Sequence, residues 1–168
     1  MTIAGRSDIE QLADEIERGY HGDPWHGAST RAVLAGIDAG TAARRPIPSA
    51  HTIGEIVAHL TTWTREIARR FAGGEPATPS AGDWPEPAGP SEAEWQAAIA
   101  DLDRAHAELL QALRRFPPER LSEPMGSTRH QALGTGLSFE GTLHGLSQHL
   151  AYHTGQIALL RKSVQVTS

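Results

Sequence analysis

Apolar residues recur along most of the chain at steps of three and four, the spacing that places them on one side of an α-helix. Four segments show this spacing, at about residues 9–20, 52–71, 91–116 and 138–163. Each has a single apolar stripe, as a helix does when it buries one side in a shared core. No segment between them shows the two-residue alternation of a strand. The pattern predicts an all-α protein built as a four-helix bundle.

Residues that cap and stop helices mark the ends of these segments. Three Ser or Thr residues are each followed by Glu three positions later, the capping-box pattern: Ser7 with Glu10, Thr52 with Glu55, and Ser91 with Glu94. Two glycines after residue 71 end the second segment, and two prolines after residue 116 end the third. We therefore expect three helix starts and two helix ends close to these positions.

The connections between the helices are rich in glycine and proline. Residues 21–51 predict one short helix at about 30–37. Residues 73–90 contain four Gly and five Pro, which predicts a long extended loop between helices 2 and 3 that is able to cross the end of the bundle. We expect Trp84 within this loop to fold back onto the bundle. The length predicts a single domain over residues 1–168.

Composition narrows the chemistry that such a bundle can carry. The 168 residues include nine histidines and no cysteine, with 20 acidic and 15 basic residues and a formal charge of −5. Without cysteine the chain has no disulfide, no cysteine-bound metal and no thiol nucleophile. The acidic balance argues against nucleic-acid binding. Uninterrupted apolar runs do not exceed four residues and the first ten residues lack an apolar leader, so we expect a cytoplasmic protein with no membrane span.

Helical geometry sorts the histidines by face, because each residue turns the helix by about 100°. His149 and His153 fall in the middle of the last apolar stripe, whereas His144 points to the opposite side. Two imidazoles one turn apart suit joint binding of one metal ion. The alternative is a pair of core histidines bonded to backbone carbonyls or to each other, and the spacing leaves both open.

Other helices offer further candidates. His59 lies mid-helix at the edge of the second apolar stripe, where it is either a third ligand or a boundary histidine. His106, on the apolar side of the third segment, is either a fourth ligand or a core residue with a hydrogen bond, and we favour the core residue. The motif that starts at His149 lacks the glutamate of zincin proteases, and the chain has no phosphate-binding glycine loop. Glu55 is assigned to a capping box, so the catalytic residues stay unknown.

Three strings of residues carry a resemblance to a known family. They are residues 24–27 (PWHG) with Ser29, residues 50–60 (AHTIGEIVAHL) followed by Trp63, and residues 149–162 (HLAYHTGQIALLRK). With these strings the chain resembles the DinB-like superfamily over nearly its whole length. Members of that superfamily include YfiT-like metal-dependent hydrolases, bacillithiol transferases and mycothiol-dependent isomerases.

The resemblance implies a four-helix bundle of the DinB/YfiT type that holds a divalent metal, zinc or nickel. One histidine of the second helix and two of the fourth bind the metal in that family, and the matching positions here are His59, His149 and His153. Three imidazoles with an open position are typical of a catalytic site. The expected function is a metal-dependent low-molecular-weight thiol S-transferase or a hydrolase. The alternative is a non-catalytic metal- or small-molecule-binding stress-response bundle.

Substrate contacts are expected close to these histidines. The candidates are Trp25, His26, Trp63 and Gln156. Gln156 could equally be a surface amide, and Trp25 and His26 could equally serve the start of a helix. The expected partners are a small-molecule substrate, including a low-molecular-weight thiol, and a second copy of the chain in a homodimer, with no nucleic acid and no membrane.

Overall fold

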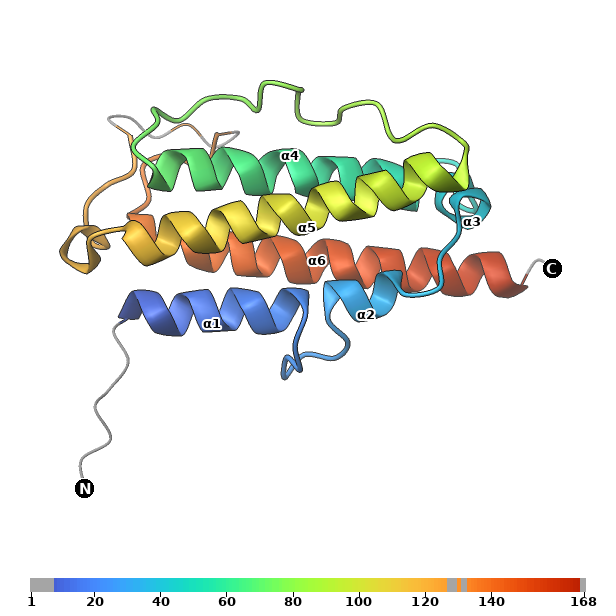
Figure 1. The fold of residues 1–168 in the computed structure, drawn as a ribbon, viewed down its shortest axis with the longest axis horizontal. Helices are drawn as coiled ribbons and strands as arrows, with labels where there is room; N and C mark the ends of the chain where they lie inside the picture. The colour runs from blue at the N-terminus through green and yellow to red at the C-terminus, as the bar shows by residue number, and fades with distance from the viewer. Residues whose placement is uncertain (1–7, 127–129, 131–132, 167–168) are drawn as a thin grey trace.

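The computed structural model describes residues 8–126, 130 and 133–166, and over these residues the chain forms a helical bundle (Figure 1). Three bundle positions are occupied by single long helices: α4 (Ile53–Phe71), α5 (Glu92–Arg115) and α6 (Phe139–Val166). The fourth position is shared by α1 (Asp8–Tyr20) and α2 (Thr30–Leu34), which follow one another along α6. The predicted all-α four-helix bundle is confirmed.

Two short helices complete the described elements, α3 (Ala39–Ala43) and the 3₁₀ helix η1 (Pro118–Arg120). The helix expected at about 30–37 is shorter than predicted and ends at Leu34. The helix α3 was not predicted; it begins where the Asp38 side chain accepts a hydrogen bond from the backbone N–H of Thr41.

Capping boxes start α4 and α5 as the sequence predicts. In α4 the hydroxyl of Thr52 accepts from the N–H of Glu55 at 3.1 Å, and the Glu55 carboxylate accepts from the N–H of Thr52 at 2.7 Å. Ser91 and Glu94 form the same pair of bonds at the start of α5. The predicted box of Ser7 with Glu10 includes Ser7, which lies outside the described residues.

The core contains the predicted apolar stripes. Leu60 of α4, Leu102 and Leu109 of α5, and Leu143 and Ile157 of α6 have no solvent exposure. Full burial of one such side chain contributes about 1.5–3 kcal/mol. These buried side chains pack α4, α5 and α6 against one another.

The helices α4 and α5 run in the same direction, so the segment 72–91 between them must return along the bundle (Figure 1). It lies along α4: the N–H of Ala77 donates to Glu66 near one end of the helix at 3.0 Å, and Pro87 lies 3.5 Å from a Cβ built on Gly54 near the other end. The expectation that this loop crosses the end of the bundle is wrong, because a parallel helix pair needs a connection that spans its length.

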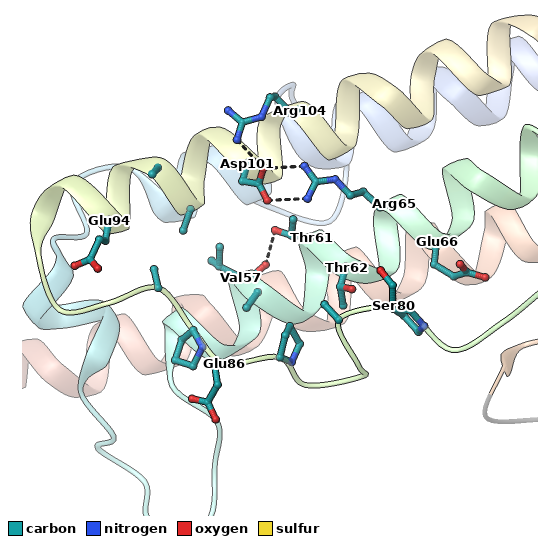
Figure 2. Close-up of a pocket in the computed structure, with 18 of the residues that line it drawn as sticks. Val57, Thr61, Thr62, Arg65, Glu66, Ser80, Glu86, Glu94, Asp101 and Arg104 are labelled. Carbon is teal, nitrogen blue, oxygen red and sulfur yellow. Dashed lines mark hydrogen bonds and ion pairs between the residues drawn. The ribbon is translucent and has the colours of Figure 1, made fainter.

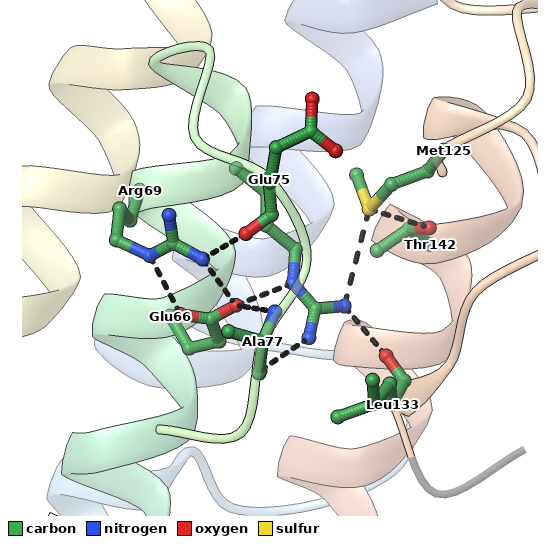
Figure 3. Close-up of polar contacts among 8 residues, drawn as sticks. Glu66, Arg69, Glu75, Ala77, Met125, Leu133 and Thr142 are labelled. Carbon is green, nitrogen blue, oxygen red and sulfur yellow. Dashed lines mark hydrogen bonds and ion pairs between the residues drawn. The ribbon is translucent and has the colours of Figure 1, made fainter. Parts of the chain in front are cut away.

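A buried ion pair anchors this segment to α4. Arg70 and Glu66 are both almost fully buried, and Arg70 Nε donates to Glu66 Oε1 at 2.8 Å. The Arg70 guanidinium also donates to the carbonyls of Ala77 and Leu133 at 3.1 and 2.6 Å, which Figure 3 shows together with Arg69. Burial raises the pKa of Glu66, but hydrogen bonds from Arg69, Arg70 and Ala77 outweigh burial and hold it below its usual value.

None of the helices in the described part of the chain combines the length with the apolarity that crossing a bilayer demands.

Candidate metal centre

Three histidines from two helices meet in the bundle. His59 comes from α4, and His149 and His153 lie one turn apart on α6. Their ring centroids are 4.5 to 5.0 Å apart, and one nitrogen of each ring lies within 4.8 Å of the others. His59 and His153 are buried and His149 is half-buried. The structure therefore brings together the three side chains that the sequence singled out.

Two of the rings are held by hydrogen bonds on the side away from the cluster. His59 Nδ1 lies 2.7 Å from the backbone carbonyl of Asp83, and His153 Nδ1 lies 2.7 Å from Gln156 Oε1. A carbonyl oxygen can only accept, so each Nδ1 carries the proton. The Nε2 lone pair of each neutral ring is then available to a cation.

The pKa of each histidine favours the neutral ring. Burial, together with the neighbouring imidazoles, lowers the pKa of His149 to about 4. Burial also lowers the pKa of His59 and of His153, against the opposing effects of Asp83 and Gln156. Neutral imidazole is the form that binds a metal, so at neutral pH the three side chains are ready as ligands.

The distance between two of the nitrogens provides a direct test of fit. His59 Nε2 and His149 Nε2 lie 2.9 Å apart. With the proton of His59 on Nδ1, the His59 Nε2 lone pair accepts a hydrogen bond from His149 Nε2–H. A divalent ion bound by both nitrogens and by His153 would take the place of this proton, because metal binding at imidazole ligands releases protons. The donor set of three neutral imidazoles therefore fits a borderline-soft divalent metal.

The segment 72–91 supplies residues that the sequence did not assign to the site. Trp84 stacks on His59 at 3.9 Å and on His51 at 3.5 Å between ring centroids, which confirms that it folds back onto the bundle. The Asp83 carboxylate accepts from Trp63 Nε1 at 2.6 Å and lies 3.4 Å from His59 Nδ1. The glycine- and proline-rich composition of this loop gives no periodicity that could have assigned Asp83 to the site.

The predicted substrate contacts separate into two groups. Trp63 and Gln156 lie beside the histidines, where Trp63 has its ring centroid 6.4 Å from that of His59. Trp25 and His26 lie in the loop between α1 and α2, and both side chains are exposed, that of Trp25 fully. The structure brings neither of them into contact with the three histidines.

The remaining sequence assignments concern residues away from the cluster. His106 is buried in the contact between α1 and α5, where its Nε2 lies 2.5 Å from Glu17 and its ring stacks on Tyr20. This confirms a core histidine with a hydrogen bond. Glu17, His21 and His106 also place ligand atoms within 4.8 Å of one another. Glu55 caps α4 and pairs with Arg45, as expected for a residue without a catalytic role.

Two of the hollows that adjoin α4 bear on the site. A cavity of about 760 Å³ lies under the segment 77–89 against α5, and in it Arg65 and Arg104 both pair with Asp101 (Figure 2). Its lining does not include the three histidines. A cleft of about 330 Å³ lies between α4 and α6, and His59 and His149 form part of its wall. Of the cavity and the cleft, only the cleft gives direct access to the histidine cluster.

Fold and site together define a class of protein: a helical bundle with three histidines gathered in its core. The sequence profile of the DinB superfamily matches residues 25–157, well over half of the chain. The chain belongs to the DinB superfamily. No curated protein and no solved structure gives a match. The match confirms the resemblance at the level of the superfamily. The three-histidine cluster of this chain is consistent with a metal-dependent function.

Proposed function

We propose that this protein is a metal-dependent enzyme that binds zinc or nickel through His59, His149 and His153. The enzyme either transfers a low-molecular-weight thiol to a small electrophilic substrate or hydrolyses that electrophilic substrate. The observation that carries the proposal is the meeting of three neutral rings, two with their Nδ1 protons engaged elsewhere. A structural site would satisfy a fourth coordination position from the protein, whereas three protein ligands are typical of catalytic sites.

A divalent metal held by three imidazoles lowers the pKa of a water molecule or thiol in its open position towards neutrality. The chain's own residues prepare that position. The Asp83 carbonyl and Gln156 fix the orientation of two rings. Trp84 covers His59 by stacking and shields the cluster from bulk water on that side.

The absence of cysteine decides where the sulfur of a thiol transfer comes from. With no thiol in the chain, the attacking sulfur belongs to a small-molecule thiol. The reaction forms a bond between this sulfur and the electrophilic carbon, and the leaving group departs with its bonding electrons. The thiol proton passes to solvent. The hydrolytic branch uses water in place of the thiol, with the same balance.

The test compares the wild-type chain loaded with zinc or nickel with a His149→Ala variant treated in the same way. Both are assayed against a panel of alkylating and acylating electrophiles, with and without small thiols. Turnover that needs the metal and a thiol supports transfer, and turnover that needs the metal alone supports hydrolysis. No metal-dependent turnover with any electrophile would count against an enzyme.

Cobalt substitution separates the enzyme from a non-catalytic binding bundle. Cobalt in an open three-histidine site should change its visible absorption when a thiol or azide is added, because the added ligand enters the coordination sphere. A spectrum that does not respond to either ligand would indicate a closed site and would contradict the proposal.

A further inference from the structure

The cleft beside the histidine cluster has the size of a small-molecule site. Its volume of about 330 Å³ is at the lower end of the range of about 300–1,000 Å³ that ligand pockets occupy. Because His59 and His149 form part of its wall, a molecule in the cleft would lie directly against the cluster. The chemistry of the other lining residues therefore indicates which substrate the site can take.

Among the described residues that line the cleft, Arg70 and Asp83 carry a formal charge, and both are engaged within the chain. Arg70 pairs with Glu66 and donates to the carbonyls of Ala77 and Leu133. Asp83 accepts the indole N–H of Trp63. An anionic group entering the cleft would lose its hydration without gaining an ion pair, because Arg70 already pairs with Glu66, and it would be repelled by the carboxylate of Asp83.

Apolar side chains form most of the remaining wall. Trp63 and Ile67 come from α4, Leu146 comes from α6, and Leu137 lies just before α6 with 43% of its surface exposed. The indole N–H of Trp63 is bonded to Asp83, so the ring offers its apolar surface to the cleft. A hydrophobic ring or chain would be stabilised by the surface that it buries against these residues.

Gly145 keeps the cleft open on the α6 side. It lies in the interior of α6, where glycine is less favourable than alanine. A Cβ built at this position meets no atom within 4 Å, so the packing of the chain does not require glycine here. Because Gly145 lines the cleft, a larger side chain would occupy space that the cleft now offers to a ligand.

We propose that this cleft binds a neutral, apolar part of the substrate, an aromatic ring or aliphatic chain, and presents the adjoining reactive carbon to the histidine cluster. The inference rests on the proposed function, because it assigns the substrate class of that same site. It disfavours anionic groups in the cleft, since the guanidinium of Arg70 is already paired with Glu66 and Asp83 is itself negative.

The experiment uses two dyes with the same ring system, neutral N-phenyl-1-naphthylamine and its sulfonated relative 1-anilinonaphthalene-8-sulfonate. Their fluorescence is titrated with the full chain and with the Gly145→Ala, Gly145→Leu and Gly145→Phe variants. The matched control is Gly155→Phe, because Gly155 also lies on α6 with no atom within 4 Å of a built Cβ, yet does not line the cleft. Circular dichroism confirms that each variant is folded.

We expect the wild-type chain to bind the neutral dye at least about tenfold more tightly than the sulfonated dye, a difference of about 1.4 kcal/mol. Affinity for the neutral dye should fall progressively from Ala to Phe at position 145 and stay unchanged in Gly155→Phe. Equal binding of both dyes, or binding unaffected by Gly145→Phe, would overturn the inference.

Zinc content, measured on the same samples, distinguishes failure of the cleft assignment from failure of the proposed metal-dependent function. We expect the wild-type chain, Gly145→Ala and Gly155→Phe to bind zinc equally, because a Cβ built on Gly145 meets no atom within 4 Å and Gly155 does not line the cleft. Zinc is measured in Gly145→Leu and Gly145→Phe as well, because position 145 lies one turn from His149. Loss of neutral-dye binding in Gly145→Phe with zinc retained supports the cleft as the substrate site. A wild-type chain that binds the dye but no zinc would refute the proposed function, and with it the assignment of the cleft to a substrate.

Discussion

Replacing Gln156 by alanine should weaken metal binding without removing a metal ligand. Gln156 Oε1 accepts the Nδ1 proton of His153 at 2.7 Å, which fixes the ring with Nε2 towards the cluster. Loss of such a supporting hydrogen bond lowers metal affinity by about 10- to 100-fold, or about 1.4–2.7 kcal/mol. Gln156 is half-buried, so water can replace part of the lost bond. We therefore expect the dissociation constant to rise by about 10- to 30-fold.

The assay is a competition titration of zinc between the protein and a chromophoric chelator. Gln156→Glu keeps an oxygen acceptor at the same place and should bind at least as tightly as the wild-type chain. Gln148→Ala, an exposed position on the same helix, is the matched control and should leave the affinity unchanged. Wild-type affinity in Gln156→Ala would refute the argument that this hydrogen bond orients His153.

Two further predictions concern the buried and half-exposed ion pairs. Arg70→Met should lower the free energy of unfolding in urea by about 3 kcal/mol, the lower end of the cost of breaking a buried ion pair, because Glu66 loses its buried partner and keeps the bonds from Arg69 and from the Ala77 N–H. A Glu66→Gln/Arg70→Met double variant should recover part of the loss. The bond from Arg65 lowers the pKa of Asp101 to about 2, so its stabilisation, at most about 1 kcal/mol for side chains this exposed, is complete above about pH 4 and lost as pH falls towards 2. Asp101→Asn should therefore unfold more easily than the wild-type chain at pH 6 and equally at pH 2, and an equal difference at both values would contradict the assignment.

The helices of this fold were predictable because their signals are local. The capping boxes at Thr52 and Ser91 place the starts of α4 and α5 within one residue, and the apolar spacing identifies α6. The same periodicity placed His149 and His153 on the buried face and His144 on the exposed one. Such predictions need only the geometry of one helix.

The path of the segment 72–91 was not predictable in this way, because it depends on contacts between residues far apart in the sequence. Its position along α4 follows from Arg70 and Glu66, whose bonds to Ala77 and Leu133 no spacing rule reveals. Asp83 joins the site only as a consequence of that path. Trp25 was predicted as a substrate contact from the motif at residues 24–27, but its side chain is fully exposed. A motif that matches the family therefore does not by itself place a residue against the histidine cluster.

Metal analysis of the purified chain tests the central claim most directly. After loading with zinc or nickel and removal of the excess, the wild-type chain should retain about one equivalent, and His149→Ala less than about a tenth. His106→Ala alters the separate cluster of Glu17, His21 and His106 and should retain the full equivalent. A wild-type chain without metal, or a full equivalent in His149→Ala, would contradict the account.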